Sequence, residues 1–363
     1  MAVFDITNRW NLKCEYCCRG ERLNSPLYKE PPLSDIKDTV KQLFEVNSNF
    51  IVLQGGEPLI RKDAGEIINY VAFLRESSGL HICNTKSLFN RLICERKTPD
   101  NFKNGYKRVL LKIGLPVLYI STNGMFYSDE ILNGLVRASA LMDISVDSFD
   151  PSVNMATRIG ADIEVIKQNI IRFSEKLSVN ISCTVTETNV NQLHLILEEA
   201  QQLGVVSVKF SPVIMIGKRD SADEFHDAYI EELFKVIETF GQKKTGMFLN
   251  IKVFHHQIST NQGQALLKLI NNTPNIFLEI HECVACKCLK EIYIDPDLNV
   301  YGCASTKNIP EMALGNLHQN TLNEIWNSEK RLNALKKMES CYDIAQKYSG
   351  CTAAALQVKG VKH

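Results

Sequence analysis

The strongest constraint on the fold of this chain is a recurring order of apolar strand, polar or glycine-containing turn, and amphipathic helix. Short runs of β-forming residues predict the strands, and helically spaced apolar residues predict the helices. We expect strands at residues 3–6, 50–53, 117–120, 141–147, 179–186 and 205–210. We expect the intervening and following helices at residues 34–46, 63–76, 129–138, 163–177, 189–203 and 222–240. This series predicts an α/β fold in which helices cover a parallel sheet.

Length and charge limit the classes of protein to which this chain can belong. Its 363 residues suffice for one large α/β domain and a smaller second one. Lys and Arg together number 41, equal to Asp and Glu, so net charge gives no signal for nucleic acid or a membrane surface. No long apolar run and no signal-peptide pattern is present, so we expect a cytoplasmic protein without a membrane span.

Cysteines are concentrated near the two ends of the chain. Nine of the twelve fall into two groups, at Cys14, Cys17 and Cys18 and at Cys283, Cys286, Cys288, Cys303, Cys341 and Cys351. In a long chain without a secretion signal, such clusters indicate metal binding or catalysis rather than disulfides. Thiolates held together at a strand end can bind a metal. The alternative interpretation is a set of free or buried structural thiols.

Two segments depart from the regular order. Residues 79–116 are much longer than the usual connection of about 2–6 residues and are locally basic, which predicts an insertion. It is either a solvated face or a lid or docking surface for an acidic partner. Past Lys244 the pattern becomes irregular, and residues 291–301 then predict a hairpin. We therefore expect one domain at residues 1–245 and a smaller one at residues 246–363.

Polar residues and glycines follow three of the predicted strands directly. They are Gly55, Gly56, Glu57 and Pro58 after the second strand, Ser121 and Asn123 at the end of the third, and Ser145 and Asp147 at the end of the fourth. Because the carboxyl ends of parallel strands meet at one edge of a sheet, these residues predict a binding site at that edge.

The cysteine loop, the glycine turn, the polar strand ends and the C-terminal cysteines together resemble the radical S-adenosylmethionine (SAM) superfamily. The C-terminal part resembles its SPASM/twitch subgroup. This resemblance covers nearly the whole chain apart from the insertion. It implies a partial (βα)6 TIM-like barrel followed by a small cysteine-rich SPASM/twitch-like domain. It also implies SAM, a [4Fe–4S] cluster at the SAM site and one auxiliary [4Fe–4S] cluster as cofactors.

The resemblance also implies roles for individual residues. Cys14 and Cys17 align with the second and third cysteines of the family's C-x3-C-x2-C signature, and Tyr16 aligns with an aromatic residue that lies against the adenine of SAM. Gly55-Gly56-Glu57-Pro58 resembles the turn that receives the methionine amino group of SAM. The remaining strand-end residues are implied to line the SAM carboxylate and ribose; these are Ser121, Asn123, Ser145 and Asp147.

The C-terminal cysteines are implied to hold the auxiliary cluster. The implied ligands are Cys288, Cys303 and Cys351, with either Cys283 or Cys286 as the fourth. Leu298 stands where the family has a glycine in the hairpin turn. A second auxiliary site is not expected, because Met338 and Lys347 replace two of its cysteines.

Trp10 is the main departure from the family pattern, because it occupies the position of the first signature cysteine. Cys18 is a poor replacement, since an adjacent side chain generally points away from that of Cys17. One hypothesis is an enzyme that completes its cluster in an unusual way, uses an external electron donor and modifies a peptide or another small polar substrate. A second is a pseudoenzyme that serves as a SAM- or partner-binding scaffold. A third is an accidental substitution in an ordinary enzyme of the family.

Overall fold

The computed structural model describes most of the predicted barrel and part of the C-terminal region. The described residues are 1–17, 30–48, 50–78, 117–213, 222–243, 245–254, 259–271, 273, 275–281, 291–307 and 309–339. The insertion at 79–116 lies outside the described residues. So do five of the six C-terminal cysteines, at positions 283, 286, 288, 341 and 351.

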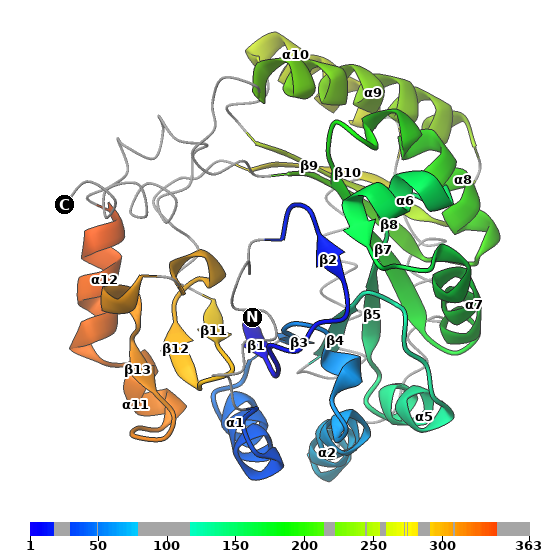
Figure 1. Ribbon diagram of the computed structural model, residues 1–363. Helices are drawn as coiled ribbons and strands as arrows, with labels where there is room; N and C mark the ends of the chain where they lie inside the picture. The colour runs from blue at the N-terminus through cyan, green and yellow to red at the C-terminus, as the bar shows by residue number, and fades with distance from the viewer. Residues whose placement is uncertain are drawn as a thin grey trace.

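One sheet of eleven strands organises the described part of the chain (Figure 1). The six predicted strands are present as β1 (Ala2–Asp5), β3 (Phe50–Gln54), β4 (Val117–Thr122), β5 (Leu141–Ser145), β7 (Ser178–Val185) and β8 (Ser207–Pro212). These strands are mutually parallel. The α/β prediction is therefore confirmed, and the sheet curves into an open barrel with helices on its outer side.

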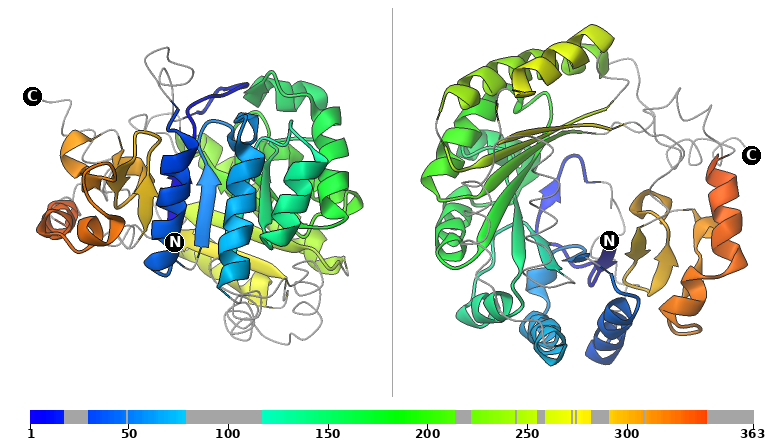
Figure 2. Two further views of the ribbon diagram at one scale, coloured as in Figure 1. Left: turned by 90° about the horizontal axis from the view of Figure 1, so that it is seen from below. Right: turned by 180° about the vertical axis from the view of Figure 1, so that it is seen from behind.

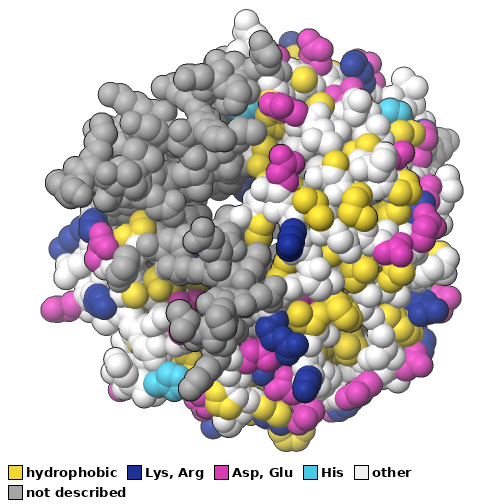
Figure 3. All heavy atoms as spheres, in the orientation of Figure 1, with side chains coloured by type: hydrophobic (Ala, Val, Ile, Leu, Met, Phe, Trp, Pro, Cys, Tyr) yellow, Lys and Arg dark blue, Asp and Glu magenta, His cyan; other side chains and the backbone are white. Residues whose placement is uncertain are grey.

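Helices follow most of these strands and cover the outer face of the sheet (Figure 2). They are α1 (Leu33–Glu45), α2 (Ala64–Ser77), α5 (Asp129–Arg137), α7 (Ile163–Ser174), α8 (Leu193–Gln202), α9 (Ala222–Gln242) and α10 (Thr260–Asn271). None of the described helices is long and apolar enough to cross a membrane. On the face shown in Figure 3, both acidic and basic side chains are scattered over the described surface among apolar and other groups.

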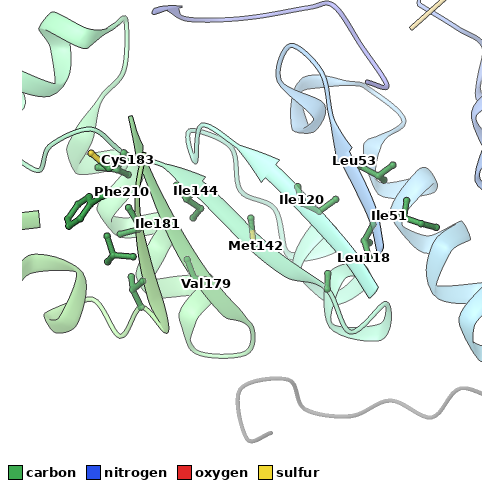
Figure 4. Close-up of a cluster of buried hydrophobic side chains, with 14 of the residues drawn as sticks. Ile51, Leu53, Leu118, Ile120, Met142, Ile144, Val179, Ile181, Cys183 and Phe210 are labelled. Carbon is green, nitrogen blue, oxygen red and sulfur yellow. The ribbon is translucent and has the colours of Figure 1, made fainter. Parts of the chain in front are cut away.

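The hydrophobic core lies between the sheet and these helices. Every second strand residue is fully buried on that side, as Ile51, Ile120, Ile144 and Phe210 illustrate (Figure 4). The residues between them point to the inner face of the open barrel and are less buried, and many are polar. This two-residue period leaves the inner face available for ligands.

The expectation of an irregular pattern past Lys244 is wrong. Strands β9 (Phe248–Phe254) and β10 (Ile276–His281) extend the parallel sheet beyond β8, with α10 between them. In β9 the apolar residues Phe248, Leu249, Ile251 and Val253 are buried. Polar residues interrupt this apolar run at positions 250 and 252, as they do in β7, so the pattern past Lys244 is that of a further strand. The boundary expected at residue 245 falls between α9 and β9 of this continuous sheet.

The C-terminal hairpin joins the other end of the same sheet. Strand β11 (Ile292–Ile294) pairs in parallel with β1, and β12 (Asn299–Tyr301) and β13 (Gly315–Asn316) add antiparallel strands. The predicted hairpin is confirmed. Two further helices, α11 (Leu322–Trp326) and α12 (Glu329–Glu339), pack beside it (Figure 1).

Candidate functional site

The cysteine loop is fixed by a small antiparallel ladder that is separate from the main sheet. Strand β2 (Lys13–Cys14) pairs with β6 (Arg158–Ile159), so that Cys14 lies opposite Arg158. The Glu15 amide donates to the Thr157 carbonyl at 3.1 Å, and the Cys17 amide donates to the Cys14 carbonyl at 3.2 Å. The ladder brings together residues more than 140 positions apart in the sequence, and Figure 1 shows β2 on the inner side of the curved sheet.

No pattern in the sequence predicts β6, but the helix before it does have a signal. Helix α6 (Pro151–Thr157) begins with the Asp150 side chain accepting hydrogen bonds from the amides of Ser152 and Val153. An Asp cap followed by Pro at the first helical position is a recognised helix start. The helix ends next to the cysteine loop, so that Arg158 pairs with Cys14. The Asp-Pro pair is therefore the sequence signal that points to Arg158, a site residue that the motifs do not predict.

Arg158 connects the cysteine loop to the end of β5. Its guanidinium is buried and forms an ion pair with the Asp147 carboxylate, with Nε 3.0 Å from Oδ2. The same guanidinium lies 3.9 Å from the Cys14 sulfur and 5.7 Å from the centre of the Tyr16 ring. The Tyr16 hydroxyl donates a hydrogen bond to Asp147. Burial, as the largest effect, raises the pKa of the Tyr16 hydroxyl, so this group remains a proton donor.

Asp147 is fully buried and held from several directions. The Thr184 amide donates to its Oδ1 at 3.0 Å, and the Asn154 side chain accepts from its backbone amide at 3.3 Å. The Asn189 amide group donates to the Asp147 carbonyl at 2.9 Å. The strand-end position predicted for Asp147 is therefore rigid. Its direct contact with SAM stays a prediction.

The glycine turn packs directly on the backbone that leads into the cysteine loop. The Gly56 amide donates to the Thr7 carbonyl at 2.7 Å, and the Glu57 amide donates to the Arg9 carbonyl at 2.8 Å. A Cβ at Gly56 would lie 1.9 Å from the Arg9 carbonyl oxygen, and one at Gly55 would lie 2.3 Å from that of Thr7. Gly55 also has a φ of 146°, in the region that favours glycine. Both glycines are thus required for the contact between turn and loop.

Glu57 ties this turn to the end of β4. Its fully buried carboxylate accepts hydrogen bonds from the Thr122 hydroxyl and the Asn123 amide, both at 2.7 Å, and from the Leu59 amide at 3.0 Å. Desolvation raises the pKa of Glu57 to about 7, although these hydrogen bonds act in the opposite direction. Pro58 begins the short helix η2 (Pro58–Ile60) and is buried. The Glu57 carboxylate holds two strand-end turns together.

Asn123 extends the network to the cysteine loop. Its side-chain amide donates to the Asn11 side chain at 2.7 Å, and its side-chain oxygen accepts from the Met125 amide at 2.9 Å. Ser121 and Ser145 occupy inner-face positions of β4 and β5 and are partly buried. The residues predicted at the SAM edge therefore meet at one end of the sheet, and Asn11, Thr122 and Arg158 join them.

In the described part of the chain, the cysteine loop supplies fewer thiols than a [4Fe–4S] cluster requires. Cys14 and Cys17 are partly buried free thiols, and Trp10 at the first signature position is partly buried against the core. The described residues contain no group of three or more Cys, His, Asp or Glu side chains placed to share a metal. Burial raises the pKa of the Cys14 thiol, which opposes the thiolate form, while the Arg158 charge favours it. Two thiols cannot hold three irons, so these residues alone do not fit the cluster.

Of the predicted auxiliary ligands, only Cys303 lies among the described residues. Its thiol is partly buried, two residues after the end of β12. The positions of Cys283, Cys288 and Cys351 lie outside the described residues. Their assembly into one site with Cys303 stays a prediction.

Comparisons with protein families identify two regions of the chain. The model of the radical SAM superfamily matches residues 5–200, which is more than half of the chain. The model of the SPASM iron–sulfur cluster-binding domain matches residues 283–352.

Curated relatives have different reactions in their names. The chain is 22% identical to an AdoMet-dependent heme synthase of Methanosarcina barkeri, over 99% of this chain and 93% of the relative. It is 25% identical to a probable GTP 3′,8-cyclase of Methanococcus aeolicus, over 66% of this chain and 65% of the relative. At these levels of identity, neither name defines a reaction for this chain.

Solved structures show the same fold at low sequence identity. Streptococcus suis SuiB bound to its precursor peptide SuiA has a TM-score of 0.64 at 13% identity, covering 97% of this chain and 70% of SuiB. A second structure, anSMEcpe with bound AdoMet, has a TM-score of 0.60 at 17% identity, covering 92% of this chain and 82% of that one. With the family matches above, the chain belongs to the radical SAM superfamily and carries a SPASM iron–sulfur cluster-binding domain in its C-terminal part.

Proposed function

We propose that this chain is a radical SAM/SPASM-type enzyme that binds SAM at the carboxyl edge of the open barrel and modifies a peptide or another small polar substrate. The observation that supports this most is the convergence of the glycine turn, the β4 and β5 ends and the cysteine loop. Glu57, Asn123, Asp147 and Arg158 connect all four through buried hydrogen bonds and an ion pair. A pre-organised rim of this kind binds a ligand with little loss of conformational freedom.

Within this proposal, different residues have different tasks. The Gly55–Gly56 backbone, the Tyr16 ring and the Ser121 and Ser145 hydroxyls are assigned to contact SAM. Glu57 and Asp147 have protein donors on both carboxylate oxygens, so their main task is to hold these groups in position. The polar inner face of β5, β7 and β8 suits a polar substrate. Peptide modification is favoured by the likeness to SuiB, which has been solved with a precursor peptide.

The cluster at the SAM site needs a ligand that the described residues do not supply. When bound, such a cluster supplies the electron that cleaves SAM. Because Cys14 and Cys17 give two thiols only, no step through the cluster is assigned to this chain. The third ligand has to come from Cys18, from elsewhere in the chain or from outside it. The auxiliary cluster is proposed at Cys303 with Cys288, Cys351 and either Cys283 or Cys286.

Replacement of Trp10 by Cys tests the assignment of the cluster loop. After anaerobic reconstitution with iron and sulfide, we expect Trp10→Cys to bind more iron than the wild type, by up to about four irons per chain, because the complete signature holds one [4Fe–4S] cluster. Trp10→Ser is the matched control, since it removes the same bulk without adding a thiol. Equal iron in all three proteins, at the content of one auxiliary cluster, would show that this loop is not the cluster site. Equal iron at the content of two clusters would show that the wild type already completes the cluster at this loop.

A second candidate function, favoured by Trp10 itself, is a pseudoenzyme that binds SAM or a partner without radical chemistry. The two candidates differ in their product. The reduced, reconstituted wild type should release 5′-deoxyadenosine from SAM if it is an enzyme, as measured by mass spectrometry. If SAM binds and the Trp10→Cys variant releases 5′-deoxyadenosine while the wild type does not, the pseudoenzyme is the correct assignment.

A further inference from the structure

Lys209, in the middle of β8, is a cation on the inner face of the open barrel. Its neighbours Val208 and Phe210 are fully buried on the outer side, and Phe210 is seen there in Figure 4. Because successive strand residues point to opposite faces, the Lys209 side chain faces inward. It is exposed to solvent, whereas most of β8 is buried or half-buried. Lysine is disfavoured in central parallel strands, so its presence here needs an explanation.

The sheet register places Lys209 close to the SAM edge. Lys209 pairs with Ser182 of β7, and Ser182 pairs with Ser145 of β5. These three residues therefore form one row across the inner face. With neighbouring strands about 4.8 Å apart, the Lys209 backbone lies about 10 Å from that of Ser145. Ser145 is a predicted SAM-edge residue, so a group bound at Lys209 would lie within one small molecule's length of SAM.

The carboxylate of Asp143 lies near the Lys209 ammonium and acts on it as an opposite charge. Asp143, on the inner face of β5, accepts hydrogen bonds from the Ser182 hydroxyl at 2.8 and 2.9 Å. The Tyr119 side chain also donates to it, and Lys209 acts on it as a nearby charge. Desolvation is the largest effect on Asp143 and raises its pKa. Among the described residues, Lys209 has no carboxylate within ion-pair distance.

We propose that Lys209 is the binding residue for an anionic group of the substrate, a carboxylate or a phosphate. Asp143, held by Ser182 and Tyr119, lies one row closer to the amino-terminal ends of the strands and acts on Lys209 as a nearby negative charge. The proposal rests on the proposed function for its location, because it places the substrate between Lys209 and SAM. It adds a charge requirement: the substrate carries a negative group that reaches the Lys209 ammonium.

Binding of two simple anions tests this site in the whole protein. The probes are inorganic pyrophosphate and glutarate, titrated calorimetrically at low ionic strength, with and without SAM. We expect Lys209→Met to weaken at least one probe by about tenfold or more, because a charged hydrogen bond is lost. Lys209→Arg keeps the charge and should stay within about threefold of the wild type. Lys235→Met is the matched control, because Lys235 lies exposed on α9.

The pattern of results separates the possible outcomes. Selective loss of pyrophosphate binding identifies a phosphate site, and selective loss of glutarate binding identifies a carboxylate site. Unchanged binding of both probes to Lys209→Met, or an equal loss in Lys235→Met, would overturn the proposal. So would failure of the wild type to bind either probe. SAM affinity is measured in the same samples, so that absence of SAM binding counts against the proposed function while the response to the anions still decides the role of Lys209.

Discussion

At the scale of single residues, Arg158 connects the cysteine loop to the end of β5. It pairs with a fully buried carboxylate and lies between the Tyr16 ring and the Cys14 sulfur. Burying this ion pair costs desolvation free energy for both charged groups. The pair therefore contributes mainly to the geometry of the site and little to the net stability of the fold. In this chain the geometry that it fixes is that of the cysteine loop relative to the end of β5.

Removal of Arg158 should therefore leave the buried Asp147 carboxylate without its counter-charge. We expect Arg158→Met to lower the free energy of unfolding by about 3–5 kcal/mol, since Asp147 would lose its only described cationic partner. The double variant Arg158→Met with Asp147→Asn should recover more than half of this loss. Urea unfolding measures both variants. Additive losses would show that the two residues do not act as a pair. SAM affinity, measured in parallel, should fall in both.

Glu57 gives the candidate site a dependence on pH. Its pKa is about 7 in the folded chain, against an ordinary value of 4.5. The native state therefore holds this proton to higher pH than the unfolded state does. The stabilisation is complete below about pH 4.5 and is lost as pH rises through about 7.

We expect the unfolding free energy of the wild type, relative to that of Glu57→Gln, to fall by up to about 3 kcal/mol between pH 4.5 and pH 7.5. Glutamine does not titrate in this range, and all other groups remain the same in the two proteins. Chemical unfolding at a series of pH values measures this difference. A difference that is flat or rises with pH would contradict the raised pKa.

At the scale of elements, the conformation of the turn between β11 and β12 gives a physical reason for the glycine that the family resemblance implies at position 298. Leu298 has a φ of 62°, a left-handed conformation that costs most residues about 1–2 kcal/mol. Its side chain is nevertheless buried, with 2% exposure, and packs in the core. In this chain the apolar contact outweighs the backbone strain.

Replacement of Leu298 by Gly should consequently destabilise the protein even though it restores the family residue. We expect the free energy of unfolding to fall by about 1–4 kcal/mol. Loss of a buried leucine costs about 2–5 kcal/mol, and relief of the backbone strain returns about 1–2 kcal/mol of it. Leu314→Gly is the control, because Leu314 is similarly buried but does not have a positive φ. Leu314→Gly should lower the free energy of unfolding more than Leu298→Gly does. Thermal or urea unfolding measures both variants. A Leu298→Gly protein more stable than the wild type would show that the backbone strain outweighs the apolar contact.

At the scale of the whole molecule, β1 joins the two ends of the chain. It pairs with β3 on one side and with β11 on the other, and it leads directly into the cysteine loop. The fully buried Asp5 carboxylate accepts hydrogen bonds from Tyr293 of β11 and from Gln54 of β3, the latter at 3.1 Å. The C-terminal hairpin is thus coupled to the strand that positions the candidate site.

We expect Tyr293→Phe to weaken this coupling. Loss of one donor to a buried carboxylate should lower the unfolding free energy by about 1–3 kcal/mol. Hydrogen exchange should rise first in β11 and β12, as followed by mass spectrometry. Tyr70→Phe on α2 is the matched control, because it removes a hydroxyl from the partly exposed surface. Unchanged exchange in β11 with an unchanged unfolding curve would show that Asp5 does not couple the two ends.

The sequence by itself determined the repeating units and the order of the motifs. Strand and helix periods are local properties, so six strands, the glycine turn and the cysteine loop could be read directly from the residues. The strands past Lys244 are not among the predicted ones, although β9 alternates apolar and polar residues as β7 does and β10 begins with an apolar run.

Only the tertiary structure decided which of these residues meet. The pairing of β2 with β6 brings Arg158 to Cys14 across 144 positions, and the turn containing Gly56 packs on the backbone of Thr7 and Arg9. It also showed that the carboxylates of Glu57 and Asp147 are buried and hydrogen-bonded within the rim, while their contact with SAM stays a prediction. Local patterns carry no information on such pairings, because they depend on how a curved sheet brings distant strand ends to one edge.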